Sequence, residues 1–476
     1  MSGILRRIFS VDYMLKEHQR TEEAMPASKE LYNITLKTAY PSIIEMFLVG
    51  LMGLVANIMV GSLGGTLGDD AIAGLGITGQ PRMILLACVF SLNVGVTAVV
   101  ARRRGENNQE KANEALMQSL MVCFFIVIIM GVFGAVFARQ LMLFAGAQEG
   151  TRILEFATDY FRITIIGFVF SSLGMVINAA QRGCGNTRIS MYTNITANLV
   201  SLTLNFLLIT GRFGLPALGV RGAAIAAVTG NITMFIICVV NVSKDGGFLK
   251  LSFKFKPVRD TLKSIANVSF SAFVEQIFMR IGFFTTARLI AGLNSAAMPA
   301  LAVYTICMQI QNISFTFGDG LNVASASLVG RSLGAKRPDM AIIYGKISQR
   351  LALVIAGVLF FIFIFGRYFF IGLFTQTESV IKMGVIIVIL IAVSSPFQMM
   401  QVVISGSLRG AGDTKFVAAI SFVCIVFIRP VLTWAFCYPL GFSVTGAWIA
   451  LTIDQMIRLG LSFRRFTKGE WTKKKV

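Results

Sequence analysis

The amino-acid sequence predicts an all-α membrane protein with twelve transmembrane helices in two six-helix lobes. Three observations predict this class: a composition that is 55% hydrophobic and only 14% charged, apolar runs long enough to cross a bilayer, and an internal repeat that relates the two halves. A soluble domain carries about a quarter charged residues, because its surface faces water. The low charge therefore favours a chain whose surface mostly faces hydrocarbon.

The apolar runs are continuous rather than alternating, as in Leu116–Ala138 and Val385–Val393. A helix needs about 20 residues to cross a bilayer, whereas a strand of an outer-membrane barrel needs about 10 residues of alternating hydrophobicity. The runs therefore predict helices. In chain order the predicted spans are 34–62, 70–101, 112–138, 151–181, 187–210, 220–242, 262–291, 296–330, 340–366, 378–408, 414–437 and 443–463.

Basic residues are concentrated in the short segments on one side of these spans. The net charge of +20 would also fit a nucleic-acid-binding protein. These residues lie between apolar runs, however, as in the cytoplasmic loops of membrane proteins. We therefore expect a multi-pass protein of the cell inner (cytoplasmic) membrane, surrounded by the lipid bilayer, with both termini in the cytoplasm and no nucleic-acid partner. The opposite loops hold only Arg139, Arg212, Arg221 and Arg367.

Four short motifs of the first half recur in the second half, in the same order. Each half has six predicted spans, and six is even, so both halves enter the membrane from the same side. The repeats are therefore parallel, as in transporters whose two lobes rock against each other around a central site. The matched positions are Glu45 and Glu275, Arg102 and Arg331, Arg182 and Arg409, and Gly222 and Gly446.

The repeat also predicts the domain organisation, and we expect the chain to act as a monomer. The predicted parts are a cytoplasmic N-terminal segment, an N-lobe, a basic cytoplasmic linker, a C-lobe and a basic cytoplasmic tail. Their bounds are 1–33, 34–242, 243–261, 262–463 and 464–476.

A paired motif, Arg-Gly-x-Gly-x-Thr, follows the fourth span of each half. It is not a phosphate-binding loop, because it lacks the Gly-Lys-Ser/Thr ending and a preceding strand. A tight cytoplasmic turn explains it better: the glycines permit the turn, and Thr187 and Thr414 are expected to cap the next helix. We expect Arg182 and Arg409 to lie at the lipid headgroups.

Charged residues inside spans are costly and mark functional sites by default. Glu45 and Glu275 stand first, because each lies in the first span of its half. One interpretation is structural, an ion pair with Arg280 or Arg288. The other is cation coupling or the binding of a cationic substrate, because a buried carboxylate that exchanges its proton for a cation has the logic of an antiporter.

The remaining ionisable residues of the spans give weaker signals. Asp454 and Arg458 are four residues apart and are expected to pair on one helix. Asp319 lies between two glycines and is a further candidate site. For Arg429, a lobe-stabilising role and a substrate contact both remain open. The full set outside Glu45 and Glu275 is Arg82, Asp159, Arg162, Arg280, Arg288, Asp319, Arg429, Asp454 and Arg458.

Cysteine and histidine usage indicates no cofactor. The seven cysteines include no CxxC spacing, so neither a zinc site nor a disulfide framework is indicated. His18 is the only histidine and lies in the N-terminal segment, which excludes a histidine proton relay in the membrane. We expect a protein that is not an enzyme.

Six stretches of the chain match a known family in order. They are Asn57–Gly61, Arg182–Thr187, Gly214–Ile225, Leu328–Gly334, Gly406–Thr414 and Gly469–Trp471. Through them the chain resembles the multidrug and toxic compound extrusion (MATE) family over residues 34–471, and their order, together with the repeat, makes the resemblance specific. The resemblance implies twelve helices in two lobes and export of a small-molecule substrate, organic cations or lipophilic drugs, by antiport with H+ or Na+ and by alternating access.

The resemblance also shows departures at acidic positions. Family acids of the first, fifth and tenth helices fall on Ala56, Asn205 and Gln398, whereas the seventh-helix glutamate matches Glu275. The resemblance therefore implies a sodium ion near Glu275. Glu45 lies eleven residues before Ala56, roughly 16 Å away on nearly the same helix face, and we hypothesise that it helps to replace the missing acid. The candidate coupling or substrate-binding residues are Glu275, Glu45, Gln398, Gln401, Asn57, Asn205 and Asp319.

The alternatives are a flippase for lipid-linked precursors, a membrane-embedded enzyme and a channel. Flippases of the same superfamily often have fourteen spans and an arginine-rich cavity, so twelve spans and the paired motif favour drug export. The sequence shows no paired-acid motif in a cytoplasmic loop and no nucleophile constellation, which disfavours an enzyme. A two-lobe repeat argues against a channel, because channels usually need a symmetric pore.

Overall fold

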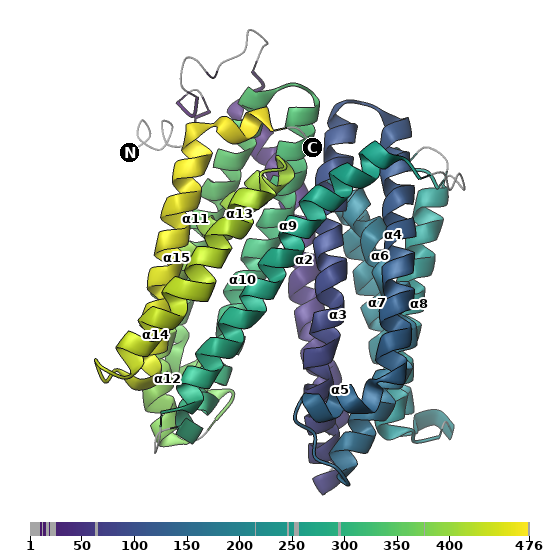
Figure 1. Ribbon diagram of the computed structural model, residues 1–476, viewed down its shortest axis with the longest axis vertical. Coiled ribbons are helices and arrows are strands. Elements are labelled where there is room, and N and C mark those ends of the chain that lie inside the picture. Colours follow the sequence, from purple (N-terminus) through teal and green to yellow (C-terminus); the bar gives the residue numbers. More distant parts are fainter. Residues whose placement is uncertain are drawn as a thin grey trace. The chain divides into compact units, whose positions relative to one another are not determined.

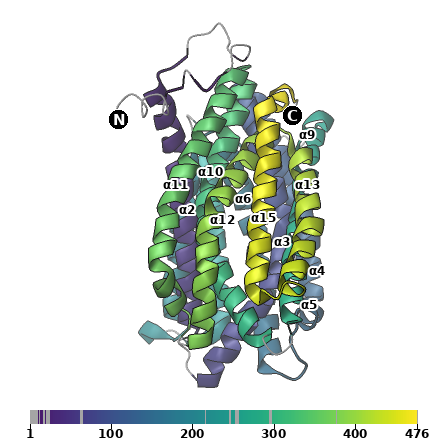
Figure 2. The ribbon, with the colours of Figure 1, turned by 90° about the vertical axis from the view of Figure 1, so that its left-hand side faces the viewer.

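The computed structural model describes residues 10–11, 13–15, 19, 25–61, 65–214, 216–244, 247–251, 257–293, 297–375 and 377–474. The described residues are almost entirely helical and contain no strand. Figures 1 and 2 show long helices that run roughly side by side within each part of the chain.

The six predicted spans of the first half are all helical. The third span is followed by a short extra helix, α5. The helices are α2 (Ser28–Gly61), α3 (Gly65–Gly105), α4 (Gln109–Val136), α5 (Ala138–Phe144), α6 (Arg152–Gly183), α7 (Thr187–Leu208) and α8 (Gly219–Ser243).

The second half repeats this order, except that its fifth span is interrupted. A π-helical segment, Phe422–Ile428, separates α13 from α14, and Arg429 and Pro430 follow it. The helices are α9 (Arg259–Ala291), α10 (Ala297–Gly334), α11 (Pro338–Gly372), α12 (Glu378–Gly410), α13 (Thr414–Ser421), α14 (Arg429–Cys437) and α15 (Ser443–Lys468). Within the described residues the prediction of twelve helical spans is confirmed.

Eight helical segments of the described chain are long and apolar enough to cross a membrane by length and composition alone. The other four predicted spans, α7, α9, α10 and α15, are more polar. Helix α9, for example, carries Glu275, Arg280 and Arg288. Three of these spans, α9, α10 and α15, hold Glu275, Asp319, Asp454 and Arg458, whose charged partners are described below.

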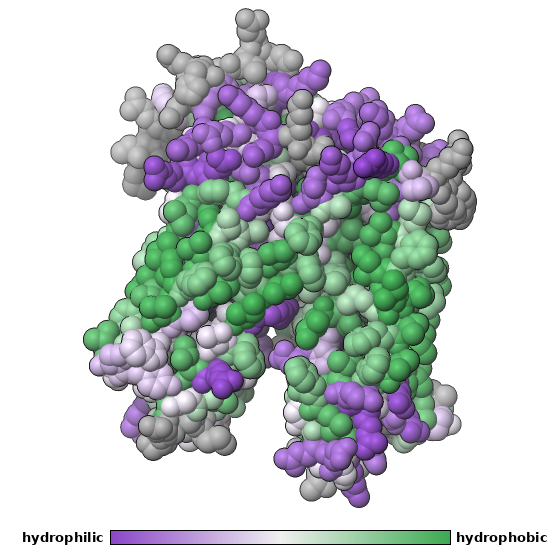
Figure 3. All heavy atoms as spheres, viewed as in Figure 1, coloured by the Kyte–Doolittle hydropathy of each residue, from purple (hydrophilic) through white to green (hydrophobic). Residues whose placement is uncertain are grey.

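Large hydrophobic side chains cover the outer faces of the helices. Phe125, Phe284 and Phe365 are 60%, 69% and 81% exposed. Figure 3 shows hydrophobic residues along the middle of the helices and hydrophilic residues toward their ends. Monomers in water rarely expose apolar patches of this extent, so these faces are suited to lipid.

The chain forms two compact units. The N-terminal unit comprises residues 44–269, and the C-terminal unit comprises the described residues of 1–43 and 270–476. One boundary falls inside α2 and the other inside α9, which are the first helices of the two halves. The start of α2 therefore belongs to the C-terminal unit, and the start of α9 belongs to the N-terminal unit. The lobe bounds 34–242 and 262–463 stay a prediction.

Each unit is built around the fourth helix of its half. In the N-terminal unit α6 packs against α3, α4, α7 and α8 (Figure 1). In the C-terminal unit α12 packs against α10, α11 and α15 (Figure 2). Small residues permit these contacts: a Cβ on Gly406 or Gly410 would lie 2.2 Å from an oxygen of Asn322 or Ala326 on α10.

Described residues near both ends of the chain pack into one hydrophobic cluster of the C-terminal unit. Val11, Met14 and Leu15 are buried there with Trp471, which is fully buried near the C-terminus. The indole of Trp471 stacks on Phe466 with ring centroids 5.0 Å apart. The two ends therefore lie at the same end of this unit, as an even number of spans requires.

Candidate functional site

Glu45 is buried in the N-terminal unit, where three donors converge on one of its oxygens. Arg182 Nη1 and Ser190 Oγ each donate to Glu45 Oε1 at 3.2 Å, and Asn194 Nδ2 donates to it at 2.6 Å. Ser190 and Asn194 are one turn apart on α7, while Arg182 lies at the end of α6. Among the described residues, the second oxygen of Glu45 has no hydrogen-bond partner.

Glu275 occupies the equivalent place in the C-terminal unit. Arg409 Nη2 donates to Glu275 Oε1 at 2.6 Å, and Ser421 Oγ donates to the same oxygen at 3.3 Å. Arg409 lies at the end of α12 and Ser421 at the end of α13. The Glu275 side chain is 8% exposed.

The two ion pairs are repeat equivalents. Arg409 and Ser421 each follow their first-half counterparts, Arg182 and Asn194, by 227 residues (409 against 182, 421 against 194). A buried carboxylate retains its charge only when a cation and hydrogen bonds compensate the lost hydration. The recurrence of a buried Glu–Arg pair therefore indicates the same electrostatic requirement in both units.

These contacts correct one expectation. The side chains of Arg182 and Arg409 are only 13% and 19% exposed, because they neutralise buried glutamates. Their position at the level of the lipid headgroups stays a prediction. The structural interpretation of the glutamates named Arg280 or Arg288 as partners, and Arg182 and Arg409 take that role instead. The repeat already matched Glu45 with Glu275 and Arg182 with Arg409. That each glutamate pairs with the arginine of its own half was not predicted.

The turns of the paired motif form as expected, with one correction. Gly185 and Gly412 adopt φ angles of 89° and 86°, a left-handed conformation that glycine permits. Thr187 and Thr414 are not caps. They are the first residues of α7 and α13, and the cap positions fall on the residues before them, Asn186 and Asp413.

A second charged cluster surrounds Asp454, which is fully buried on α15. Arg458 Nη2 lies 3.2 Å from Asp454 Oδ2, which confirms the predicted pair. Arg429 Nη2 donates to the same oxygen at 2.5 Å and Arg429 Nε at 3.2 Å. This contact gives Arg429 a lobe-stabilising role, because it ties α14 to α15.

Arg409 also interacts with Asp319, a half-buried residue of α10. The two are close enough for the charge of Arg409 to act on the Asp319 carboxylate. Arg409 therefore has two carboxylates in its surroundings, Glu275 by hydrogen bond and Asp319 by electrostatic attraction. Its Nε is buried without a hydrogen-bond partner among the described residues.

The candidate site residues with amide side chains form no hydrogen bond with these charged clusters in the part of the chain that the structure describes. Gln398 is fully buried and accepts a hydrogen bond of 2.8 Å from Gln311 Nε2. Gln401 donates to a serine hydroxyl one turn further along α12. Asn205 is buried in α7, and its Oδ1 has no partner among the described residues. Asn57 lies in α2, but its side chain is outside the described part of the structure.

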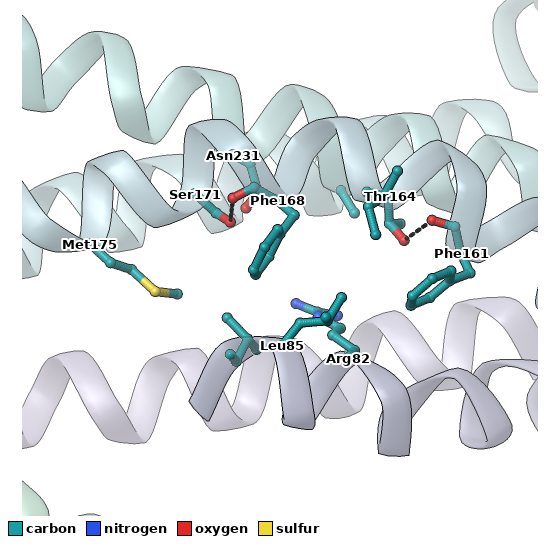
Figure 4. A pocket seen from close by; sticks show the side chains of 11 residues that line it. Arg82, Leu85, Phe161, Thr164, Phe168, Ser171, Met175 and Asn231 are labelled. Atoms are coloured by element: carbon teal, nitrogen blue, oxygen red, sulfur yellow. Dashed lines mark hydrogen bonds between the residues drawn. The ribbon is translucent and has the colours of Figure 1, made fainter. Parts of the chain in front are cut away.

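A pocket in the N-terminal unit was not predicted as a site. Figure 4 shows the side chains of its 11 lining residues, which come from α3, α6 and α8, with Arg82 pointing between the helices. Its volume is about 50 Å³. The lining residues are Arg82, Leu85, Leu86, Phe161, Thr164, Ile165, Phe168, Ser171, Met175, Ala227 and Asn231.

The described residues contain no group of three or more histidine, cysteine, aspartate or glutamate side chains that could hold a metal ion. The oxygen of Glu275 that faces its neighbours already accepts from Arg409 and Ser421. A sodium ion near Glu275 stays a prediction.

Comparison with known proteins agrees with the repeat. The family model MatE matches the chain twice, at residues 41–207 and 271–435. The second match begins 230 residues after the first (271 against 41), the same separation as that between Glu45 and Glu275. Two copies of one unit therefore make up most of the chain.

Curated relatives and solved structures match nearly the whole chain. The probable multidrug resistance protein NorM of Thermotoga maritima is 26% identical over 97% of both chains, and the uncharacterized transporter YisQ of Bacillus subtilis is 27% identical over 94% of this chain and 96% of its own. The outward-facing structure of a multidrug resistance MATE family transporter of the MOP superfamily has a TM-score of 0.85 at 20% identity, covering 94% of this chain and 97% of its own.

A second solved structure has the same fold. It is a MOP superfamily transporter from Pyrococcus furiosus, described as having a binding pocket of reversed polarity that suggests a different function. Its TM-score is 0.83 at 22% identity, and the match covers 94% of this chain and 97% of that one. With the double match to the family model and twelve helices in two repeats, the chain belongs to the MatE family of multidrug and toxic compound extrusion transporters.

Proposed function

We propose that the chain is a secondary active exporter of small lipophilic organic molecules in the cell inner membrane. Both termini lie in the cytoplasm, and substrate leaves in exchange for protons or sodium ions by alternating access of two lobes. Membership of an efflux family supports the transport class. The observation that carries the coupling mechanism is the buried carboxylate–arginine pair inside each unit.

Glu275 is the coupling residue of this proposal. The charged carboxylate of Glu275 attracts Arg409, and Glu275 Oε1 lies 2.6 Å from Arg409 Nη2. A proton or a cation that binds Glu275 neutralises this charge and frees Arg409, whose guanidinium then has Asp319 as its remaining partner. A side chain with two alternative partners is a two-state element, and ion binding biases its equilibrium by favouring one state.

Alternating access needs such an element to act on whole helices. Glu275 lies on α9, Arg409 on α12 and Asp319 on α10, so a transfer of Arg409 changes which helix α12 is tied to. Helix α12 is the central helix of the C-terminal unit. Ion binding at one carboxylate is thereby transmitted to the packing of the unit.

The resemblance and the described pocket support the proposed substrate class. The family resemblance implies organic cations or lipophilic drugs. The pocket between α3, α6 and α8 favours the lipophilic class, because its walls are mostly apolar and its charged residue is an arginine. Relatives named as multidrug resistance proteins support a substrate range of this kind.

Transport in proteoliposomes, with a proton gradient and a sodium gradient imposed separately, tests the proposal. We expect one gradient to drive accumulation of dyes from a panel of cationic, neutral and anionic lipophilic compounds. Glu275→Gln should abolish this gradient-driven transport, because the carboxylate that exchanges the ion is gone. Glu378→Gln is the matched control, since Glu378 has an 81% exposed side chain at the start of α12.

Normal gradient-driven transport by Glu275→Gln would contradict the coupling mechanism. Absence of gradient-driven transport of every dye by the wild type would contradict exporter function. A lipid-flipping assay on the same vesicles separates drug export from the flippase alternative.

A further inference from the structure

The pocket of the N-terminal unit has a single sign of charge. Arg82 is exposed on α3 and points into the space between the helices (Figure 4). Among the eleven described residues that line the pocket it is the charged one, and none carries a carboxylate. A cationic ligand would therefore meet repulsion here, whereas an anion would meet an accessible guanidinium.

The hydrogen-bond donors of the pocket point to the same ligand. Ser171 Oγ donates to the backbone oxygen of Phe168 at 3.0 Å, and Thr164 Oγ1 donates to that of Tyr160 at 2.8 Å. Both hydroxyl protons are thus engaged within α6. The donors left to a ligand are the guanidinium of Arg82 and the amide of Asn231, and guanidinium binds carboxylate and phosphate oxygens through paired hydrogen bonds.

The lining of the pocket combines one charged group with an apolar wall. A volume of about 50 Å³ holds a group of a few heavy atoms rather than a whole drug molecule. Apolar lining residues recur along α6 from Phe161 to Met175, two positions that lie fourteen residues and roughly 21 Å apart along the helix. An anionic group at Arg82 would therefore have an apolar wall beside it for a hydrocarbon or aromatic tail.

The depth of Arg82 fits this arrangement. Arg82 lies twenty residues before Arg102, the first of the basic residues that end α3, which is roughly 30 Å along the helix and about one hydrocarbon thickness. If Arg102 marks the cytoplasmic headgroups, Arg82 lies near the opposite boundary. The head group of an amphipathic molecule prefers that depth, and its tail points back toward the membrane interior.

We propose that this pocket binds the anionic head group of an amphipathic ligand, a carboxylate, sulfonate or phosphate, with its tail along α6. As a statement about the exported substrate, this inference rests on the proposed function; the binding itself does not. The source of the anion is either a free amphiphile or the head group of an anionic lipid.

Binding to the purified protein in phosphatidylcholine nanodiscs tests the proposal without any transport. The probes are 11-(dansylamino)undecanoic acid and its methyl ester, which share a tail and differ in charge. We expect the acid to bind the wild type at least tenfold more tightly than the ester does. Arg82→Gln should remove this difference, and Arg82→Lys should restore part of it because the charge returns.

Arg162→Gln is the matched control. Arg162 is another exposed arginine of a predicted span in the same unit, but it does not line the pocket. Its substitution should leave the affinity for the acid unchanged. Equal binding of acid and ester by the wild type, or undiminished binding of the acid by Arg82→Gln, would overturn the proposal.

Nanodiscs that contain phosphatidylglycerol distinguish the two sources of the anion. If an anionic lipid is the ligand, phosphatidylglycerol should weaken binding of the acid to the wild type and have no such effect on Arg82→Gln. If a free amphiphile is the ligand, phosphatidylglycerol should leave binding to the wild type unchanged. Failure of dansyl binding together with intact gradient-driven transport would reject this site while leaving the exporter function standing.

Discussion

At the scale of residues, the main feature of the structure is that buried acidic side chains are paired with arginines. Glu45 and Glu275 are buried against Arg182 and Arg409, and Asp454 is buried between Arg429 and Arg458. Removing one member of a buried pair is more harmful than replacing both, because the remaining charge loses its compensation. These clusters therefore stabilise the folded state only as complete sets.

Single and double replacement of Glu275 and Arg409 should reveal this coupling. We expect Arg409→Gln to cost about 3–5 kcal/mol, because it leaves Glu275 charged and unpaired. Glu275→Gln should cost less, since Asp319 still faces Arg409. The double variant should be more stable than the sum of the single effects predicts, with a coupling of about 0.5–3 kcal/mol in detergent unfolding measurements. Strict additivity would argue against the pair.

Asp454→Asn should destabilise the C-terminal unit strongly, by about 3–5 kcal/mol, because two buried arginines then lack a counter-charge. Unfolding of the purified protein in detergent measures this effect. Asp159→Asn is the control, because Asp159 pairs with Arg221 at an exposed site where an ion pair contributes little. Equal losses of stability in the two variants would mean that burial of the ion pair does not determine how much the pair stabilises the protein.

Sequence reasoning found the carboxylates of the candidate site but not their partners. Glu45 and Glu275 stood out because a charge inside an apolar span is costly wherever the chain folds. Arg182 is 137 residues from Glu45, and hydropathy carries no information about which helices meet. The Arg82 pocket was missed for the same reason, because its walls come from three helices that only the fold brings together.

At the scale of elements, helix ends were predictable and interruptions were not. The predicted span 187–210 corresponds to Thr187–Leu208, and 151–181 to Arg152–Gly183. The π-helical segment Phe422–Ile428 is as apolar as a membrane-spanning α-helix. The hydropathy of the sequence therefore did not predict the interruption. It lies where Ile425 approaches α9 closely: a Cβ on Gly282 would be 2.2 Å from its Cγ2.

Contact between α12 and α10 in the C-terminal unit depends on glycine. A Cβ on Gly410 would lie 2.2 Å from the backbone oxygen of Ala326, so Gly410→Ala should push α12 away from α10 and cost roughly 1–3 kcal/mol. Gly357→Ala on α11 is the control, since nothing lies within 4 Å of its Cβ. There the alanine should be neutral or stabilising, because it favours the helix. Thermal unfolding in detergent compares the two, and a harmless Gly410→Ala would disprove the close approach.

At the scale of the whole molecule, the organisation is a duplication. The same family model matches both halves, the same ion pair is buried in both units, and the fourth helix is central in both. Burial of the residues near both chain ends in one cluster agrees with an even number of passes. Composition predicted the membrane class, and the repeat predicted two parallel copies.

Labelling of one matched pair of positions tests the parallel duplication most directly. Arg188 and Lys415 are exposed repeat equivalents that follow the two motif turns. Each would be replaced by cysteine in a chain without native cysteines and treated with a membrane-impermeant maleimide in right-side-out and inside-out vesicles. The account predicts that both positions react only in inside-out vesicles, where the cytoplasmic face is accessible. Reaction of the two positions from opposite faces of the membrane would contradict it.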